Sequence, residues 1–192
     1  MTANIQFLLL KYRAVILLLF GQKALALEVF EEMVRNFPDK AYPLASRAHM
    51  RLALGQREAA LKDMHQLTVL EPSSAAHWFN LGFVLEEDGQ YEAAAEAFSS
   101  ATQLDPKLDR AWYGLGLVNI RLQRYDAAVA ALKTNTELQP MSPYGWYQLA
   151  RVHVDRQEPD EALKIIRRLK GFEPKVAAQL ERETGLHSLQ SA

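Results

Sequence analysis

The chain has 192 residues, of which 22 are basic and 23 acidic, so its formal net charge is −1. This balance, without a long run of one sign, gives no reason to expect a nucleic-acid-binding protein. Cysteine is absent, which excludes disulfides and thiolate chemistry and fits a reducing compartment such as the cytoplasm.

The first apolar segment is residues 5–20, IQFLLLKYRAVILLLF. A signal peptide is one interpretation, but Lys11 and Arg13 lie inside the apolar stretch and no A-x-A-like cleavage site follows. A membrane span is another, but the segment is shorter than the roughly 20 apolar residues needed and carries two charges. We therefore interpret residues 5–20 as the first helix of a repeat.

Pro38 is the first of five prolines that are spaced 34 residues apart. The others are Pro72, Pro106, Pro140 and Pro174. The chain has eight prolines in all, and chance does not place five of them in such a series. A fixed period of about 20–50 residues is typical of repeat proteins, in which one supersecondary unit is stacked many times.

Other residues recur with the same period, in columns whose members share their size. Two columns contain only small residues, which let helices approach closely, and two contain large apolar residues, which fill the space around them. The columns are Ala26, Ala60, Ala94, Ala128 and Ala162; Ala14, Ala48, Gly82, Gly116 and Ala150; Leu10, Leu44, Trp78, Trp112 and Trp146; and Phe30, Met64, Phe98, Leu132 and Ile166.

Each repeat contains two stretches of helical periodicity, so we predict ten repeat helices. Gly21, Gly55 and Gly89 separate the two stretches in the first three repeats, because glycine adopts the left-handed conformation that ends a helix at low cost. Gln123 and Gln157 take this position in the last two repeats. The periodic prolines end the second helix of each repeat, since proline cannot continue a helix.

These residues carry a family resemblance. The pattern W-x2-L-G…A-x3-F…P is reproduced by Trp78, Leu81, Gly82, Ala94, Phe98 and Pro106, and repeated by Trp112, Leu115, Gly116, Ala128 and Pro140. The chain thus resembles the tetratricopeptide repeat family over roughly residues 5–176, although Leu85 stands where tyrosine is usual, and Arg13 and Arg47 replace the leucine of later repeats.

The resemblance implies an all-α fold, a right-handed α-solenoid of helix-turn-helix units that forms a single domain over residues 1–192. The five repeats are expected at about residues 7–40, 41–74, 75–108, 109–142 and 143–176. Residues 175–184 carry an apolar stripe among polar residues, which predicts a C-terminal capping helix that Gly185 ends. Residues 185–192 are expected to form a frayed tail.

No motif for catalysis or for a cofactor is recognisable. The five histidines do not have the spacing of a metal site, and there is no glycine-rich phosphate loop or G-x-S-x-G. The acidic cluster of Glu86, Glu87 and Asp88 fits a solvated helix end better than a metal site. The tryptophans share a column with leucines, which favours packing over a ligand cage. We therefore predict no enzymatic activity, no metal and no cofactor.

In the family that the chain resembles, the first helix of each unit lines a concave groove. Following the exposed face of these helices at helical spacing gives a candidate peptide-binding groove rich in aromatic residues and arginine, types enriched at binding hot spots. Its predicted residues are Tyr42, His49, Phe79, Asn80, Phe83, Glu87, Arg110, Tyr113, Leu117, Arg121, Tyr144, Tyr147 and Arg151.

The first helix is apolar almost all round, so we expect another surface to cover it. The predicted contact residues are Phe7, Leu8, Val15, Leu18 and Leu19. Self-association is the simplest cover, because a two-fold pairing places the same patch on both chains. A membrane surface or a different protein are the alternatives.

The leading function is a non-catalytic scaffold in the cytoplasm that binds a peptide or protein segment in its groove. One alternative is a membrane-associated assembly factor that docks through the first helix. Another is a regulatory subunit of an enzyme complex. The sequence names no partner, and no nucleic-acid partner is expected.

Overall fold

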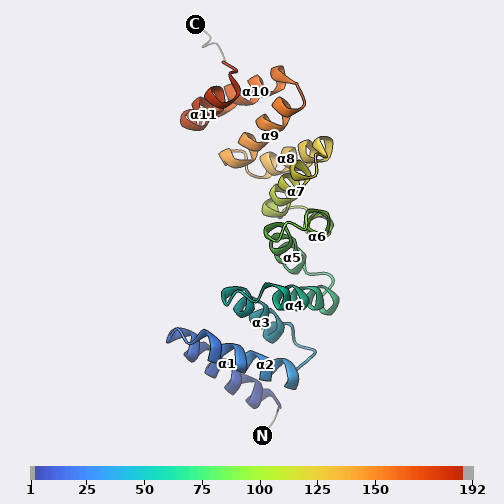
Figure 1. The fold of residues 1–192 in the computed structure, drawn as a ribbon, viewed down its shortest axis with the longest axis vertical. Helices are drawn as coiled ribbons and strands as arrows, with labels where there is room; N and C mark the ends of the chain where they lie inside the picture. The colour runs from blue at the N-terminus through green and yellow to red at the C-terminus, as the bar shows by residue number, and fades with distance from the viewer. Residues whose placement is uncertain (1–2, 188–192) are drawn as a thin grey trace. The chain divides into compact units, whose positions relative to one another are not determined.

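The computed structural model describes residues 3–187, and every regular element in this part of the chain is an α-helix (Figure 1). The predicted all-α class is thus confirmed. The helices are α1 (Ala3–Leu19), α2 (Lys23–Asn36), α3 (Ala41–Ala53), α4 (Arg57–Leu70), α5 (Ala75–Glu87), α6 (Tyr91–Leu104), α7 (Asp109–Arg121), α8 (Tyr125–Leu138), α9 (Pro143–Asp155), α10 (Pro159–Lys170) and α11 (Pro174–Thr184).

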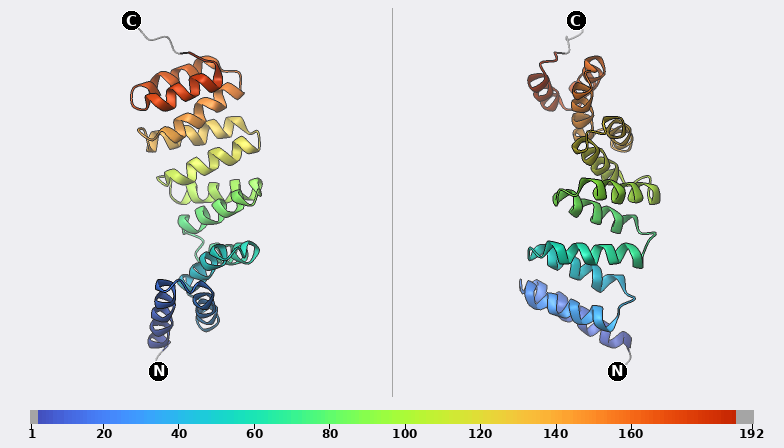
Figure 2. Two further views of the ribbon diagram at one scale, coloured as in Figure 1. Left: turned by 60° about the vertical axis from the view of Figure 1, so that its left-hand side comes forward. Right: turned by 45° about the vertical axis from the view of Figure 1, so that its right-hand side comes forward.

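The contacts divide the chain into two compact units, Met1–Leu81 and Gly82–Ala192, which we call unit 1 and unit 2. In unit 1, α1 packs on α2, α2 on α3, and α3 on α4. In unit 2, each helix from α6 to α11 packs on the next, and the helical hairpins are apparent in Figure 2. Each unit is therefore a series of antiparallel pairs joined by short connections.

The turn inside each pair is built in the same way five times. Gly21, Gly55 and Gly89 have φ angles of +69°, +75° and +75°, in the left-handed region, as the sequence predicts. Gln123 and Gln157 adopt the same conformation, with φ angles of 57° and 61°. After each of these residues, the next amide donates back across the helix end, for example from Arg124 N to Asn119 O at 2.8 Å. Glutamine therefore serves as the left-handed cap in the last two repeats, at a steric cost that glycine avoids.

The periodic prolines and tryptophans are joined by a hydrogen bond. The indole Nε1 atoms of Trp78, Trp112 and Trp146 donate to the carbonyl oxygens of Pro72, Pro106 and Pro140, at 3.0, 2.9 and 3.0 Å. Each bond ties the start of one helix pair to the connection that precedes it. The tryptophan column thus has a structural role, which agrees with its interpretation as packing.

Small and large columns meet where the two helices of a pair cross. The five alanines of the first column have no exposed surface. A Cβ atom added at Gly82 would lie 2.9 Å from the Phe98 ring, and one at Gly116 would lie 2.6 Å from Leu132. Because protein interiors are close-packed, these glycines set the distance between the paired helices.

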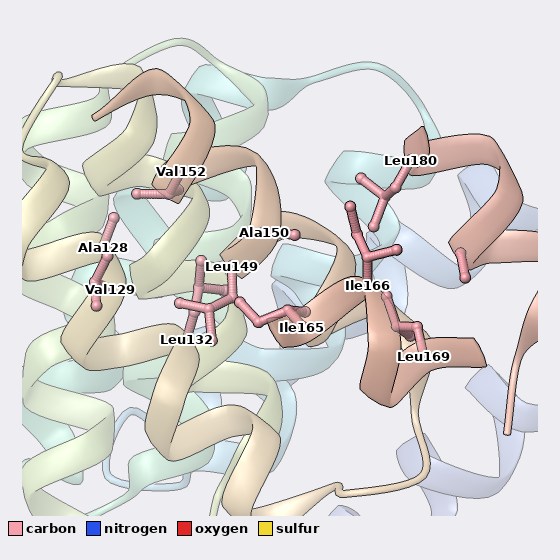
Figure 3. Packing of buried hydrophobic residues seen from close by; sticks show 11 residues of the cluster. Ala128, Val129, Leu132, Leu149, Ala150, Val152, Ile165, Ile166, Leu169 and Leu180 are labelled. Carbon is pink, nitrogen blue, oxygen red and sulfur yellow. The ribbon is translucent and has the colours of Figure 1, made fainter. Parts of the chain in front are cut away.

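The core of unit 2 continues into α11. Leu132, Leu149 and Ile165 belong to one cluster of buried residues with Ala177 and Leu180 of α11 (Figure 3). Both α11 residues are completely buried, and Gly185 follows the helix with a φ angle of 70°. The helix predicted at residues 175–184 is therefore present, and its apolar side covers the last repeat pair.

The core of unit 1 contains an ionic cluster. Asp63 in α4 is only 2% exposed, and it accepts hydrogen bonds from Arg47 at 2.6 and 3.0 Å and from Arg51 at 2.8 and 2.9 Å. Arg51 also pairs with Glu31 of α2 at 3.3 Å. The arginine in the leucine column is thus accommodated by a buried carboxylate on the facing helix.

Candidate functional site

The odd-numbered helices of unit 2 share one face. In the described part of this unit, α9 contacts α7 and α11 directly, whereas α6, α8 and α10 make no comparable contact with one another. The odd-numbered helices therefore lie closer together than the even-numbered ones. This difference curves unit 2 toward α7, α9 and α11, and the curved inner side is where an extended segment could bind.

Polar side chains connect neighbouring helices across this face. Burial raises the pKa of the Tyr113 hydroxyl in α7, and the interaction with Gln148 of α9 partly opposes this shift. The Tyr147 hydroxyl donates to Glu183 of α11 at 2.5 Å, and Arg151 lies 3.6 Å from the same carboxylate. Three helices thus contribute to a continuous polar surface.

A cavity of about 390 Å³ opens on this surface. Two arginines, two carboxylates and one amide line it together with three aliphatic side chains, so it offers both charges and apolar contacts. The lining residues are Glu86, Leu117, Ile120, Arg121, Gln148, Arg151, Val152 and Asp155. All of them belong to unit 2.

The two carboxylates Glu86, in the cavity, and Glu183, which pairs with the cavity residue Arg151, have opposite pKa shifts. Burial raises the pKa of Glu86 above its ordinary value, Arg121 partly opposes this shift, and Glu87 adds to it. At the α11 side, the hydrogen bond from Tyr147 lowers the pKa of Glu183, with smaller effects from Gln179 and Arg151. The ionised form is thus disfavoured for Glu86 and favoured for Glu183.

The structure brings together part of the groove set proposed for unit 2. Leu117, Arg121 and Arg151 line the cavity. Tyr113 interacts with the cavity residue Gln148, and the hydroxyl of Tyr147 donates to Glu183. The other members are on the surface of the same odd-numbered helices, where Phe83 is 48% and Tyr144 71% exposed. Glu87 and Arg110 are also exposed.

The groove residues proposed for unit 1 do not line this cavity. Tyr42 and His49 line a smaller one of about 310 Å³, whose other residues are Leu18, Phe30, Ala45, Ser46 and Met50. The Lys11 ammonium lies over the Tyr42 ring, 4.8 Å from its centre. Phe79 is half-buried and Asn80 exposed, both in the part of α5 that belongs to unit 1.

Several cavity residues are not in the predicted set. Glu86, Gln148 and Asp155 each lie within one helical turn of a predicted residue. Glu183 does not line the cavity, but it pairs with Arg151, which does. The prediction stepped along each helix every three or four residues, so it selected one row of side chains. A cavity is also lined by the side chains next to that row. A search one position to either side would have included Glu86 and Gln148.

The predicted contact residues of the first helix divide into two groups. Leu8, Val15 and Leu19 are exposed. Phe7 and Leu18 instead pack against the core of unit 1, and the Phe7 ring meets Phe37 edge to face at a centroid distance of 5.1 Å. The outward face of α1 therefore includes three of the five predicted residues.

Within residues 3–187, no three histidine or acidic side chains are grouped as metal ligands would be. In the same part of the chain, none of the helices is long and apolar enough to cross a bilayer.

The chain is similar to several solved repeat structures. It is 18% identical to MamA protein, with 97% of each chain covered and a TM-score of 0.79. It is 20% identical to MamA 41-end from Desulfovibrio magneticus RS-1, with coverage of 92% and 96% and a TM-score of 0.76. It is 15% identical to YrrB, described as a TPR protein with an unusual peptide-binding site, with 88% of each chain covered and a TM-score of 0.76. At these identities the likeness concerns the fold.

No curated protein matches the sequence. Two sequence models of the tetratricopeptide repeat match residues 45–109 and residues 85–147, and together they span more than half of the chain. Their overlap, residues 85–109, contains the whole of α6 and the periodic Pro106. The paired helices, the periodic columns and these matches show that the chain belongs to the tetratricopeptide repeat family.

Proposed function

We propose that this protein is a non-catalytic scaffold that binds a segment of a partner protein along the odd-numbered helices of unit 2. The observation that carries the proposal is the cavity that Arg121, Gln148 and Arg151 line beside exposed aromatic residues. The tetratricopeptide repeat fold serves protein interaction, and the similar YrrB is itself described as having a peptide-binding site. No catalytic role is assigned to any residue.

The side chains fit the recognition of an extended segment. Phe83 and Tyr144 offer large exposed rings, which contribute contact area with little loss of conformational entropy. Arg151 is held by Tyr147 and Glu183, so its guanidinium is already oriented before a partner arrives. Glu86 and Asp155 add acceptors for the backbone amides or basic side chains of the segment.

The proposal treats residues 1–192 as one scaffold with five repeats and a capping helix. Tyr42 and His49 line the 310 Å³ cavity of unit 1, which is a separate and more apolar candidate contact for an apolar side chain. We propose no nucleic-acid partner, since the net charge is −1.

The test begins with a pull-down and mass spectrometry to identify a partner, followed by binding measurements with the purified pair. Arg121→Glu combined with Arg151→Glu should weaken binding by about tenfold or more, because each reversal places like charges against the contacts that the wild type makes. Arg167→Glu, at an exposed position of α10, is the matched control and should bind as the wild type does. Wild-type affinity in the double variant, with an unchanged melting temperature, would exclude this face as the binding site.

A further inference from the structure

The outward face of α1 carries an apolar stripe that no described residue covers. We define the stripe as Leu8, Leu9, Tyr12, Val15, Ile16 and Leu19. These residues are between 40% and 80% exposed, and they recur every three or four positions, so they form one continuous ridge along the helix. Such a ridge has the spacing that a second helix recognises.

The later repeats show what covers the equivalent face. Ile16 corresponds to Met50, Val118 and Val152, which are 7%, 0% and 0% exposed, whereas Ile16 itself is 54% exposed. Met50 packs in the cluster formed by α1 and α2. In each of these repeats, the first helix packs against the second helix of the preceding pair, as α3 does against α2.

The glycines of the later repeats locate this contact in detail. Leu9 corresponds to Gly145, where an added Cβ would meet Asn135 and Thr136 of α8. Tyr12 corresponds to Gly114, where an added Cβ would meet the Phe98 ring of α6. Leu9, Tyr12 and Ile16 thus lie where the later repeats receive a preceding helix. Leu8, Val15 and Leu19 correspond instead to positions that are exposed in later repeats as well, among them Tyr144, Arg151 and Arg121.

The charges beside the stripe argue against a second copy of the chain as its cover. The helix contains two basic residues, Lys11 and Arg13, on opposite sides of the stripe, and no acidic residue. Two such helices would place basic residues against basic residues in either orientation. The exposed residues of α11 include Glu183 as well as Lys175 and Arg182, so repulsion between like charges disfavours a pairing of two α1 helices but not a contact with α11.

We propose that α1 is the docking site for an amphipathic helix of a partner protein, which lies on α1 as α2 lies on α3 and has acidic residues beside its apolar face. Arg13 is exposed and makes no ion pair within the described residues, which leaves it available to such a carboxylate. Tyr12 occupies the place where Gly114 accepts Phe98, so the docking helix carries a small residue opposite Tyr12. This site is separate from the face of unit 2 and does not depend on its function.

The probe is a synthetic amphipathic helix with leucine at its apolar heptad positions, alanine opposite Tyr12 and glutamate at the flanking positions. A matched peptide carries lysine in place of glutamate. Fluorescence anisotropy with the full chain should show at least about tenfold tighter binding of the glutamate peptide, a difference of about 1.4 kcal/mol. Equal binding of the two peptides, or none, would overturn the proposal.

Variants locate the interaction on α1. Leu9→Ser combined with Ile16→Ser should abolish binding of the glutamate peptide while leaving the melting temperature unchanged, because both side chains are exposed in the free chain. Arg13→Glu should reverse the preference between the two peptides. Val69→Ser, at an 80% exposed position of α4, is the matched control and should bind the glutamate peptide normally.

Two further measurements test the alternative covers. Flotation with vesicles that contain phosphatidylglycerol should leave the chain in the unbound fraction, and light scattering should give the monomer mass. Vesicle binding that is lost in the Leu9→Ser and Ile16→Ser variant would identify a membrane surface and overturn the proposal. A dimer that this variant dissociates would do the same in favour of a second copy.

Discussion

Asp63 is a buried carboxylate at a position where the next two repeats have Ala97 and Ala131. The facing column has Arg47 in the same repeat and Leu81 and Leu115 in the next two. One repeat has therefore replaced a leucine–alanine contact by an ion pair. Both partners of the exchange are required, because a buried charge without its counterion is strongly unfavourable.

Asp63→Ala alone should lower the free energy of unfolding by about 3–5 kcal/mol, since it leaves the guanidinium groups of Arg47 and Arg51 without their shared acceptor. The double variant Arg47→Leu with Asp63→Ala restores the pair found at Leu81 and Ala97, and it should recover most of that loss. Urea denaturation of the two variants and the wild type gives the comparison. Additive losses in the double variant would contradict the interpretation.

Glu86 gives a pH-dependent contribution to stability. Its pKa in the folded state is raised by burial above the ordinary value of about 4.3, so the folded protein holds this proton more tightly than the unfolded chain does. Stability contributed by the protonated form is therefore lost as pH rises through the folded-state pKa, and the ionised group destabilises the fold at neutral pH.

Glu86→Gln should accordingly raise the melting temperature at neutral pH, and this gain should shrink as pH falls toward 4.3. Thermal unfolding followed by circular dichroism over a series of pH values measures the difference. Glu96→Gln, at an exposed position of α6, controls for the loss of one negative charge. A gain at Glu86 that does not change with pH would show that burial of the carboxylate is not its cause.

At the scale of the element, the turn inside each helix pair allows a reciprocal exchange. Gln123 has a left-handed backbone with φ of 57°, and Gly89 has one with φ of 75° and no atoms within 4 Å of an added Cβ. Both positions have a left-handed backbone, and a side chain at Gly89 would meet no neighbour. An exchange of glutamine and glycine therefore changes only the cost of holding the left-handed conformation. Left-handed geometry costs a residue with a Cβ roughly 1–2 kcal/mol, which the greater entropy loss of glycine offsets in part.

Gln123→Gly should thus stabilise the protein by up to about 1 kcal/mol, and Gly89→Gln should destabilise it by a similar amount. Denaturant midpoints of the two variants, measured against the wild type, test the pair of expectations together. The prediction fails when both changes shift the midpoint in the same direction.

The helices could be predicted because each column packs against another column. Gly82 is small where Phe98 is large, and Gly116 is small where Leu132 is large, so a period in the sequence corresponds to a repeated contact. The cavity in unit 2 was predicted only in part. Its contact between Arg151 and Glu183 joins a repeat to the capping helix, and a single contact of this kind leaves no periodic signal.

The ionic cluster of unit 1 is only partly predictable from the sequence. Arg47 departs from the leucine column, and Asp63 departs from the alanine column that faces it. Two residues of opposite charge that replace leucine and alanine at facing positions indicate an ion pair. This inference requires knowing that the two columns face each other. The geometry of the helix pair supplies that information.

At the scale of the whole molecule, repeats interact only with their neighbours, so a local defect should remain local. Leu180→Ala removes a completely buried side chain from α11 and should cost about 2–5 kcal/mol in the last repeat pair. Hydrogen exchange followed by mass spectrometry should show faster exchange in α9, α10 and α11, with α1 to α4 unchanged. A uniform increase along the chain would instead indicate global cooperativity.

The hydrogen bonds from tryptophan to proline have a mechanical consequence. We call the connection between successive helix pairs a joint. At Pro72, Pro106 and Pro140, the hydrogen bond from the indole to the proline carbonyl must break before the joint can open. The joints at Pro38 and Pro174 have Leu44 and Leu180 in the corresponding place, and leucine cannot donate such a bond. Under a stretching force, each of the three joints with tryptophan must therefore break this hydrogen bond before it opens, and the two outermost joints have no such bond to break.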